Sequence, residues 1–147
     1  MNVRTLPTQQ NVPSWFSRML VLGYYDGPTE GIAECREGHV AVLRMVDWDD
    51  RQDVRVFSVC ELPSAPFNEL ERLVAETENP TWPVFLPRVP LSDAGECAVQ
   101  GLLDKAQRPE YVVACESPVG TVVASSAYPE GVEPDRHDWF SGLDIER

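Results

Sequence analysis

Short apolar runs separated by turn residues dominate residues 18–61, and this pattern predicts β-strands. About four strands are expected, at residues 18–25, 32–35, 39–46 and 54–61. The segments between them are rich in Gly, Pro and Asp, which favours turns at 26–31, 36–38 and 47–53. Strands joined in succession by short turns form an antiparallel β-meander.

The apolar spacing changes after this meander and predicts two helices. Ser64 is expected to cap the first, with Pro66 in its first turn and Asn79-Pro80 ending it. Its apolar side is formed by Phe67, Leu70, Leu73 and Val74. The second helix is expected to begin at Ser92 and to end before Pro109, with Val99, Leu102, Leu103 and Ala106 on its apolar side.

Two further segments complete the expected fold. Residues 82–89 contain Pro83 and Pro87, so they are predicted to be an extended edge or loop rather than a central strand. Residues 111–116 and 121–126 flank a Ser-Pro-Val-Gly turn and predict a hairpin. Strands followed by segregated helices predict an α+β fold class.

The domain organisation follows from changes in composition. Residues 1–14 are polar and are expected to be a flexible lead-in, whereas residues 15–128 form the single α+β domain. Residues 129–147 are acidic and are expected to form a tail. Trp139 and Phe140 are the residues expected to dock this tail on the domain.

Centring the turns gives a strand register, in which Tyr25 pairs with Gly31, Cys35 with His39, and Val46 with Val54. Both faces of the sheet are then largely apolar. One face carries Met19, Val21, Tyr25, Ala33, Cys35, Ala41, Leu43, Met45, Phe57 and Val59, and the other carries Leu20, Leu22, Tyr24, Ile32, Val40, Val42, Val46, Val54, Val56 and Cys60. We therefore expect a sheet that is covered on both sides, curled into a partial barrel, or paired with another subunit.

Charge and cysteine usage narrow the classes of partner. The chain has 147 residues and a formal charge of −12, which opposes binding to nucleic acid and to anionic membrane surfaces. No apolar run approaches the roughly 18 residues that span a bilayer. The four cysteines are far apart, and no secretory signal is evident, so reduced thiols in the cytoplasm are expected. No cofactor motif is present, and no cofactor is expected.

The meander has one geometric consequence for function. Its connections alternate between the two ends of the sheet, so the turns at 26–31 and 47–53 are expected to lie at the same end. That end gathers the acidic residues Asp26, Glu30, Asp47, Asp49, Asp50 and Asp53, opposed by Arg51. Trp48 lies among them, with Tyr24 or Tyr25 expected beside it. An aromatic ring among acids suits recognition of Arg or Lys by cation–π contact and ion pairing, although Trp48 can instead fold back over the sheet.

Metal binding offers two alternatives. The acidic turns can hold a hard cation such as Ca²⁺, yet 47–53 does not match an EF-hand, because Arg51 stands where an oxygen ligand is needed. Solvated turns are the simpler interpretation. Cys35 and His39 face each other across a tight turn and can supply two zinc ligands, but Cys60 is expected on the opposite face. Buried structural cysteines are favoured here.

Catalysis finds little support in the sequence. The only other histidine, His137, precedes Asp138 and Trp139 in the expected tail, so a His–Asp pair depends on that tail folding back. Nucleotide-binding loops, zinc-protease motifs and nucleophile elbows are absent from the sequence.

The sequence favours a non-catalytic binding or regulatory module that uses its acidic end to meet a cationic protein partner. An immunity protein that neutralises a toxin is one example, by analogy alone. The chain looks like a small bacterial protein, a resemblance that brings no activity with it. The alternatives are a metal-assisted hydrolase at the same end and a structural homodimer that hides an apolar sheet face.

Overall fold

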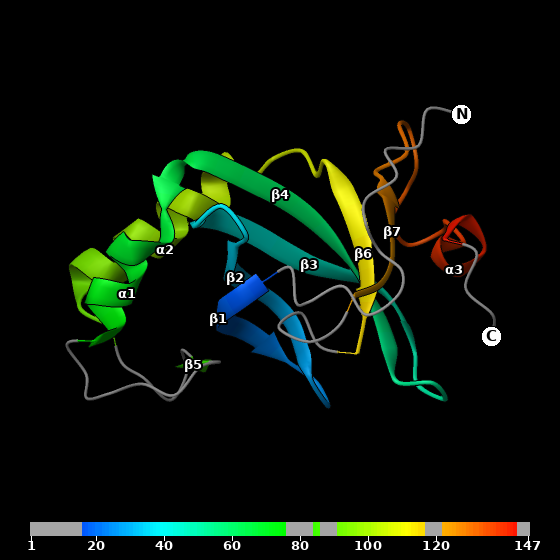
Figure 1. The fold of residues 1–147 in the computed structure, drawn as a ribbon, viewed down its shortest axis with the longest axis horizontal. Helices are drawn as coiled ribbons and strands as arrows, with labels where there is room; N and C mark the ends of the chain where they lie inside the picture. Colours follow the sequence, from blue (N-terminus) through cyan, green and yellow to red (C-terminus); the bar gives the residue numbers. More distant parts are fainter. Residues whose placement is uncertain (1–15, 76–83, 86–90, 117–121, 144–147) are drawn as a thin grey trace.

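The computed structural model describes residues 16–75, 84–85, 91–116 and 122–143. Its centre is one sheet with the strand order β5-β1-β2-β3-β4-β6-β7 (Figure 1). The strands are β1 (Phe16–Tyr24), β2 (Pro28–Cys35), β3 (His39–Asp49), β4 (Val54–Pro66), β5 (Val84–Phe85), β6 (Tyr111–Cys115) and β7 (Val122–Ala127). Six strands are antiparallel to their neighbours, and the short β5 runs parallel to β1 at the edge. The class is therefore an open antiparallel sheet with helices, as the sequence predicts.

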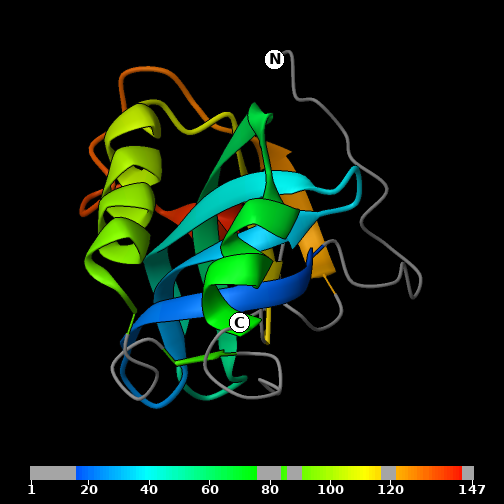
Figure 2. The same cartoon turned by 90° about the vertical axis from the view of Figure 1, so that its left-hand side faces the viewer.

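Three helices accompany the sheet: α1 (Phe67–Ala75), α2 (Asp93–Lys105) and α3 (Trp139–Gly142). In Figure 2, α1 and α2 lie in front of the strands and cover one face of the sheet. The predicted cap of the second helix is confirmed, because Ser92 Oγ accepts a hydrogen bond of 3.1 Å from Gly95 N. No helix among the described residues is long and apolar enough to cross a membrane.

Several element boundaries differ from the prediction because strand pairing extends further than the turn residues suggest. β4 continues to Pro66, which pairs with His39, so Ser64 lies in a strand and α1 begins only at Phe67. β2 begins at Pro28 and β3 continues to Asp49. The shortened turns are possible because Asp26, Gly27 and Asp53 adopt positive φ angles of 51°, 141° and 53°. The predicted end of the first helix at 79–80 and the turn at 117–120 lie outside the described residues.

Two of the three predicted strand registers are wrong. In the first hairpin, Gly31 pairs with Val21 and not with Tyr25 as predicted. In the third, the predicted pair Val46–Val54 places Phe57 opposite Leu43, but Phe57 pairs with Met45. The pairing centred on Cys35 and His39 is confirmed by the pair Glu34–Val40. Over most of each strand the error is an even number of residues, so the buried side chains stay on their predicted faces. Beside the β3–β4 turn a β-bulge makes the error odd, and Val54 pairs with Asp49.

One face of the curved sheet forms a continuous apolar core that runs from β1 to β7. Its buried members are Phe16, Met19, Val21, Ala33, Cys35, Ala41, Leu43, Phe57, Val59, Tyr111, Val113, Cys115 and Val122. The predicted members are all present except Tyr25, which is exposed in the turn, and Met45 is half-buried against the cluster.

The other face is divided between two clusters. Leu20, Ile32, Val40 and Val42 pack against α1 and α2. Val54, Val56, Val112 and Ala114 pack against Trp139, Phe140 and Leu143, which lie in and beside α3. Both faces are thus buried within one chain, so the apolar pattern on which the homodimer alternative rested needs no second subunit.

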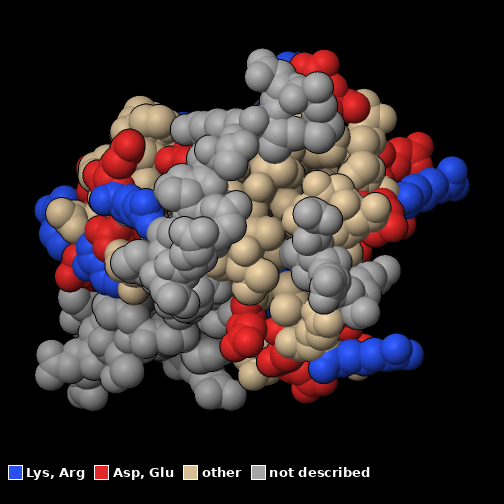
Figure 3. Space-filling view, turned by 45° about the vertical axis from the view of Figure 1, so that its right-hand side comes forward, with Lys and Arg blue, Asp and Glu red and all other residues tan. Residues whose placement is uncertain are grey.

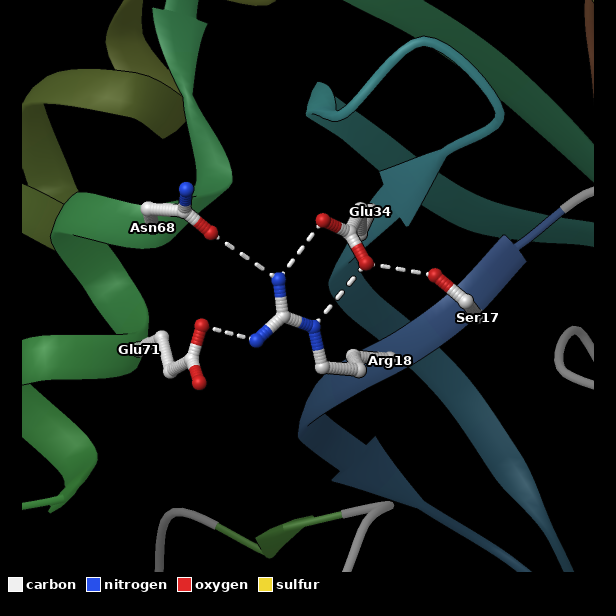
Figure 4. A network of polar contacts seen from close by, with 5 residues as sticks. All are labelled: Ser17, Arg18, Glu34, Asn68 and Glu71. Atoms are coloured by element: carbon white, nitrogen blue, oxygen red, sulfur yellow. Dashed lines mark hydrogen bonds and ion pairs between the residues drawn. The ribbon is translucent and has the colours of Figure 1, made fainter.

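A charged network ties α1 to the sheet (Figure 4). Arg18 of β1 donates to both carboxylate oxygens of Glu34 in β2, at 2.9 and 2.6 Å. The same guanidinium pairs with Glu71 and donates to Asn68, both on α1, and lies 4.9 Å from the centre of the Phe67 ring. Arg18 therefore joins the sheet edge to the first two turns of the helix, and the pKa of Glu34 is held below its ordinary value by this arginine.

Candidate functional site: an acidic end with two tyrosines

The two turns that the sequence places at one end of the sheet do meet. The rings of Tyr25, in the β1–β2 turn, and Trp48, near the end of β3, lie edge to face with their centres 6.0 Å apart. Arg55 Nη2 of β4 donates to Tyr25 O at 2.7 Å, which ties β4 to the β1–β2 turn. The two segments that carry the predicted acidic end (Asp26, Glu30, Asp47, Asp49, Asp50 and Asp53) are thus in contact through Tyr25 and Trp48.

Arg55 organises this end, and sequence reasoning missed it. Its side chain is only 1% exposed. Besides Tyr25 O, its guanidinium donates to Pro28 O at 3.2 Å and to Gly27 O at 3.4 Å. A side chain at Gly27 would meet this guanidinium, since a Cβ atom built there lies 3.0 Å from Arg55 Cζ. The signal in the sequence is a lone arginine inside the apolar run Val54–Val59.

The acids at this end fall into two groups. Asp26, Asp50 and Asp53 are exposed on the turns. Asp49 is 9% exposed and accepts a hydrogen bond from Arg51 N, whereas Asp47 accepts one from Trp48 N. Glu30 lies within β2, half-buried, and not in a turn. Of these six acids, only the three in the first group are exposed to solvent rather than half-buried or buried.

Two tyrosines add an exposed aromatic surface to these acids. Tyr24 is 62% exposed and Tyr25 is 68% exposed, and the only other large exposed hydrophobic side chain among the described residues is Val123. Figure 3 shows acidic side chains gathered along the lower edge of the molecule, with a basic side chain projecting among them. Asp26 and the two tyrosines are consecutive, so carboxylate and ring share one turn.

Trp48 packs against the chain's own Arg55. The Arg55 guanidinium lies 4.3 Å from the centre of the indole ring, so the chain's own arginine occupies one face of Trp48. The side chain is half-buried, and its Nε1 is buried without a hydrogen-bond partner. This arrangement matches the alternative in which Trp48 folds back over the end of the sheet, and the exposed tyrosines remain available for contact.

A cation site at the acidic end gains no support from this geometry. The described residues contain one group of three metal-ligating side chains within 4.8 Å of one another, and it consists of Cys35, His39 and Glu61. That group lies at the opposite end of the sheet, beside the 36–38 turn. Asp47 and Asp49 each use a carboxylate oxygen to accept a backbone N–H.

Glu61 is the residue that sequence reasoning missed at this second end. Its Oε1 lies 2.8 Å from His39 Nε2, and its carboxylate also interacts with the Tyr111 hydroxyl. Glu61 continues the alternation of Phe57 and Val59, and this is the signal that places it on the face of Cys35. Cys60 packs in the cluster under α1 and α2 on the other face, as predicted.

The cysteines here are not activated nucleophiles. Burial raises the pKa of the Cys35 thiol, and the backbone N–H groups of Glu37 and His39 offset this only in part. Burial also raises the pKa of Cys60 and of Cys115. A thiol with a raised pKa is a poor nucleophile at neutral pH.

The His137–Asp138 pair does not form a catalytic arrangement. Asp138 caps α3, since its Oδ1 accepts a hydrogen bond of 3.1 Å from Ser141 N. The His137 ring packs against Trp139, with ring centres 4.5 Å apart. Both side chains therefore serve the packing of this segment on the sheet.

Comparisons of the chain with protein-family models, with curated proteins and with solved structures each return no match. The fold and the two polar ends define the class only as a small antiparallel α+β protein with an acidic, tyrosine-bearing edge. Function must be inferred from the chemistry of those ends.

Proposed function

We propose that this protein is a non-catalytic recognition module whose acidic end binds a basic surface on a protein partner. The observation that carries the proposal is the exposure of Tyr24 and Tyr25 beside the free carboxylates of Asp26, Asp50 and Asp53. Tyrosine is enriched at the energetic centres of interfaces, and acids around it complement arginine and lysine.

The contacts beneath this surface favour rigid binding. Arg55 bonds to three successive parts of the β1–β2 turn, and Trp48 supports the Tyr25 ring from below. A surface that is ordered before binding loses less conformational entropy when its partner arrives. The tyrosines can then accept an arginine over their rings while an aspartate pairs with it.

The charge of the whole chain adds a kinetic argument. A formal charge of −12 attracts a cationic partner over a distance set by the Debye length, about 8 Å at physiological salt. Association is then expected to be fast at low salt and to slow steeply as salt rises.

The test is a partner screen with immobilised protein, followed by measurement of affinity at low and high salt. The triple variant Asp26→Asn, Asp50→Asn, Asp53→Asn removes the exposed charges and is expected to weaken binding at least tenfold. The double variant Tyr24→Ser, Tyr25→Ser is expected to do the same. The matched control, Glu96→Gln, Glu130→Gln, Asp135→Asn, neutralises three exposed acids on other segments and should bind like the wild type.

A partner whose affinity is insensitive to salt and to both variants would contradict the proposal. Loss of binding in the control triple variant as well would reduce the effect to net charge and would remove the specific role of the acidic end.

A further inference from the structure

At the end of the sheet opposite the acidic end, one cluster combines a thiol, an imidazole and a carboxylate. Cys35 closes β2, His39 opens β3, and Glu61 lies in β4 opposite Ala41. One atom from each lies within 4.8 Å of the other two. We propose that these three side chains bind a divalent transition-metal ion of the Zn²⁺ type, a role that is separate from the acidic end.

The donor set selects the metal. Thiolate and imidazole together favour Zn²⁺, and Mg²⁺ or Ca²⁺ would require mainly oxygen ligands. In a tetrahedral zinc site with bonds of about 2.0–2.3 Å, ligand atoms lie about 3.3–3.7 Å apart. The three ligand atoms lie within 4.8 Å of one another, and His39 Nε2 lies 2.8 Å from Glu61 Oε1, so the range expected for zinc falls between these values. The distance from His39 Nε2 to Glu61 Oε1 has to increase by less than about 1 Å to admit the ion.

The surroundings of the three side chains fit a metal site as well. A ligating histidine usually places its second ring nitrogen near a carboxylate, and His39 Nδ1 lies 3.7 Å from Glu37 Oε2. The Tyr111 hydroxyl holds the Glu61 carboxylate. Two backbone N–H groups, those of Glu37 and His39, are directed at the Cys35 sulfur.

The site is also rigid and sheltered. Cys35 is 6% exposed and His39 is 7% exposed, and the Glu61 side chain remains 22% exposed, which leaves a route to solvent. All three lie on neighbouring strands of one sheet, so their spacing is fixed by β-pairing. In the described part of the chain the group has three members, as in sites that leave a fourth position for water or substrate.

The experiment uses Co²⁺, which substitutes for Zn²⁺ and reports its ligands by absorption. The full chain, stripped with a chelator, is titrated with Co²⁺ and then with Zn²⁺. We expect one equivalent to bind, a thiolate-to-cobalt charge-transfer band and tetrahedral d–d bands, all displaced by Zn²⁺. Cys35→Ser should abolish the charge-transfer band, and Cys97→Ser, a cysteine exposed on α2, should leave it unchanged.

Variants of the other groups separate a metal site from a simple His–Glu ion pair. His39→Gln and Glu61→Gln should each weaken Co²⁺ binding more than about a hundredfold, and Glu37→Ala should weaken it about tenfold. Glu37 is 80% exposed at its side chain, so Glu37→Ala should fold normally even if a core variant does not.

The proposal is overturned if wild-type protein shows no charge-transfer band, or if the band survives in Cys35→Ser and disappears in Cys97→Ser. Unchanged affinity in His39→Gln would equally overturn it, and unchanged affinity in Glu37→Ala would remove the supporting role assigned to Glu37. The triple aspartate variant of the acidic end should bind Co²⁺ like the wild type, so failure of one proposal does not decide the other.

Discussion

Arg55 shows how one buried charge can fix a surface. Its acceptors are the carbonyl oxygens of Tyr25, Gly27 and Pro28, and its flat face lies on Trp48. Carbonyl groups in a tight turn have few other buried donors available, so the guanidinium satisfies several of them at once. The guanidinium thereby holds the backbone of the turn from which the exposed Tyr25 ring projects.

Replacing Arg55 by Met keeps the approximate volume and removes the donors. We expect Arg55→Met to lower the free energy of unfolding by about 2–4 kcal/mol, because charge-assisted hydrogen bonds are lost and buried carbonyls are left unpaired. Urea unfolding of both proteins measures this difference. Arg44→Met, at an exposed arginine of the adjacent strand, is the control and should change stability by less than about 0.5 kcal/mol. Equal effects of the two substitutions would contradict the role given to Arg55.

At the scale of elements, the hydrophobic pattern predicts faces better than registers. Alternation assigns Met19, Ala33, Leu43 and Val59 to one face even when the strand register is predicted wrongly, provided that the register error is an even number of residues. The register itself depends on turn length, and positive φ angles at Asp26 and Gly27 shorten the first turn. A β-bulge between Met45 and Asp47 adds a further shift that no composition rule reveals.

The polar ends were harder to predict for a related reason. Arg55 and Glu61 are charged residues on the same face of β4 as the apolar Phe57 and Val59, so a hydrophobicity argument treats them as exceptions. Only contacts between strands give them a role. Cys35 and His39 were found because only a three-residue turn that contains a glycine separates them. Tyr111 reaches the same cluster from the hairpin strand β6, whose place beside β4 depends on long-range pairing.

The attachment of α1 depends on Arg18 and Glu34. Two parallel hydrogen bonds join the guanidinium to the carboxylate, and the arginine continues to Glu71 on the helix (Figure 4). Their side chains are 19% and 16% exposed, so solvent screens this pair less than an ordinary surface pair. The network therefore contributes to helix docking as well as to pairing of β1 with β2.

Glu34→Gln should destabilise the protein by about 1–2 kcal/mol at neutral pH, since one charged acceptor is lost. The Arg18 contacts lower the pKa of Glu34 from its ordinary value of 4.5, so the unfolded state binds the proton more readily. This contribution is fully present above pH 4.5 and is lost as the pH falls through the lower folded-state pKa. Urea unfolding at a series of pH values should therefore show that the difference in free energy of unfolding between the wild type and Glu34→Gln decreases from neutral to acidic pH.

Glu133→Gln provides the control for this prediction. Glu133 pairs with Arg136, but both side chains are largely exposed, at 72% and 84%. An exposed ion pair contributes about 0–1 kcal/mol at most. If Glu133→Gln and Glu34→Gln changed stability equally at every pH, the buried network would have no special part in holding α1.

At the scale of the whole molecule, two polar ends bound one apolar core. Arg55 closes the core face beside the acidic turns, and the Cys35–His39–Glu61 group lies at the far end of the same face. Phe57 and Val59 separate them along β4. The sheet thus presents two different chemistries in opposite directions, and the two proposed sites do not compete for one surface.

The acidic end, where we propose that a partner binds, should reduce the stability of the fold. Exposed like charges on adjacent turns repel one another, and each such pair destabilises by about 0.2–0.5 kcal/mol at low salt. Asn accepts the positive φ angles of Asp26 and Asp53, so the triple variant Asp26→Asn, Asp50→Asn, Asp53→Asn keeps the backbone. We expect it to be about 0.5–1 kcal/mol more stable than the wild type at low salt and equal to it at high salt.

Thermal unfolding at both salt concentrations measures this difference in stability. The variant Glu96→Gln, Glu130→Gln, Asp135→Asn is the control, and its stability should increase less. A triple variant less stable than the wild type would mean that these carboxylates hold the turns together, and their exposure could then no longer be attributed to a partner.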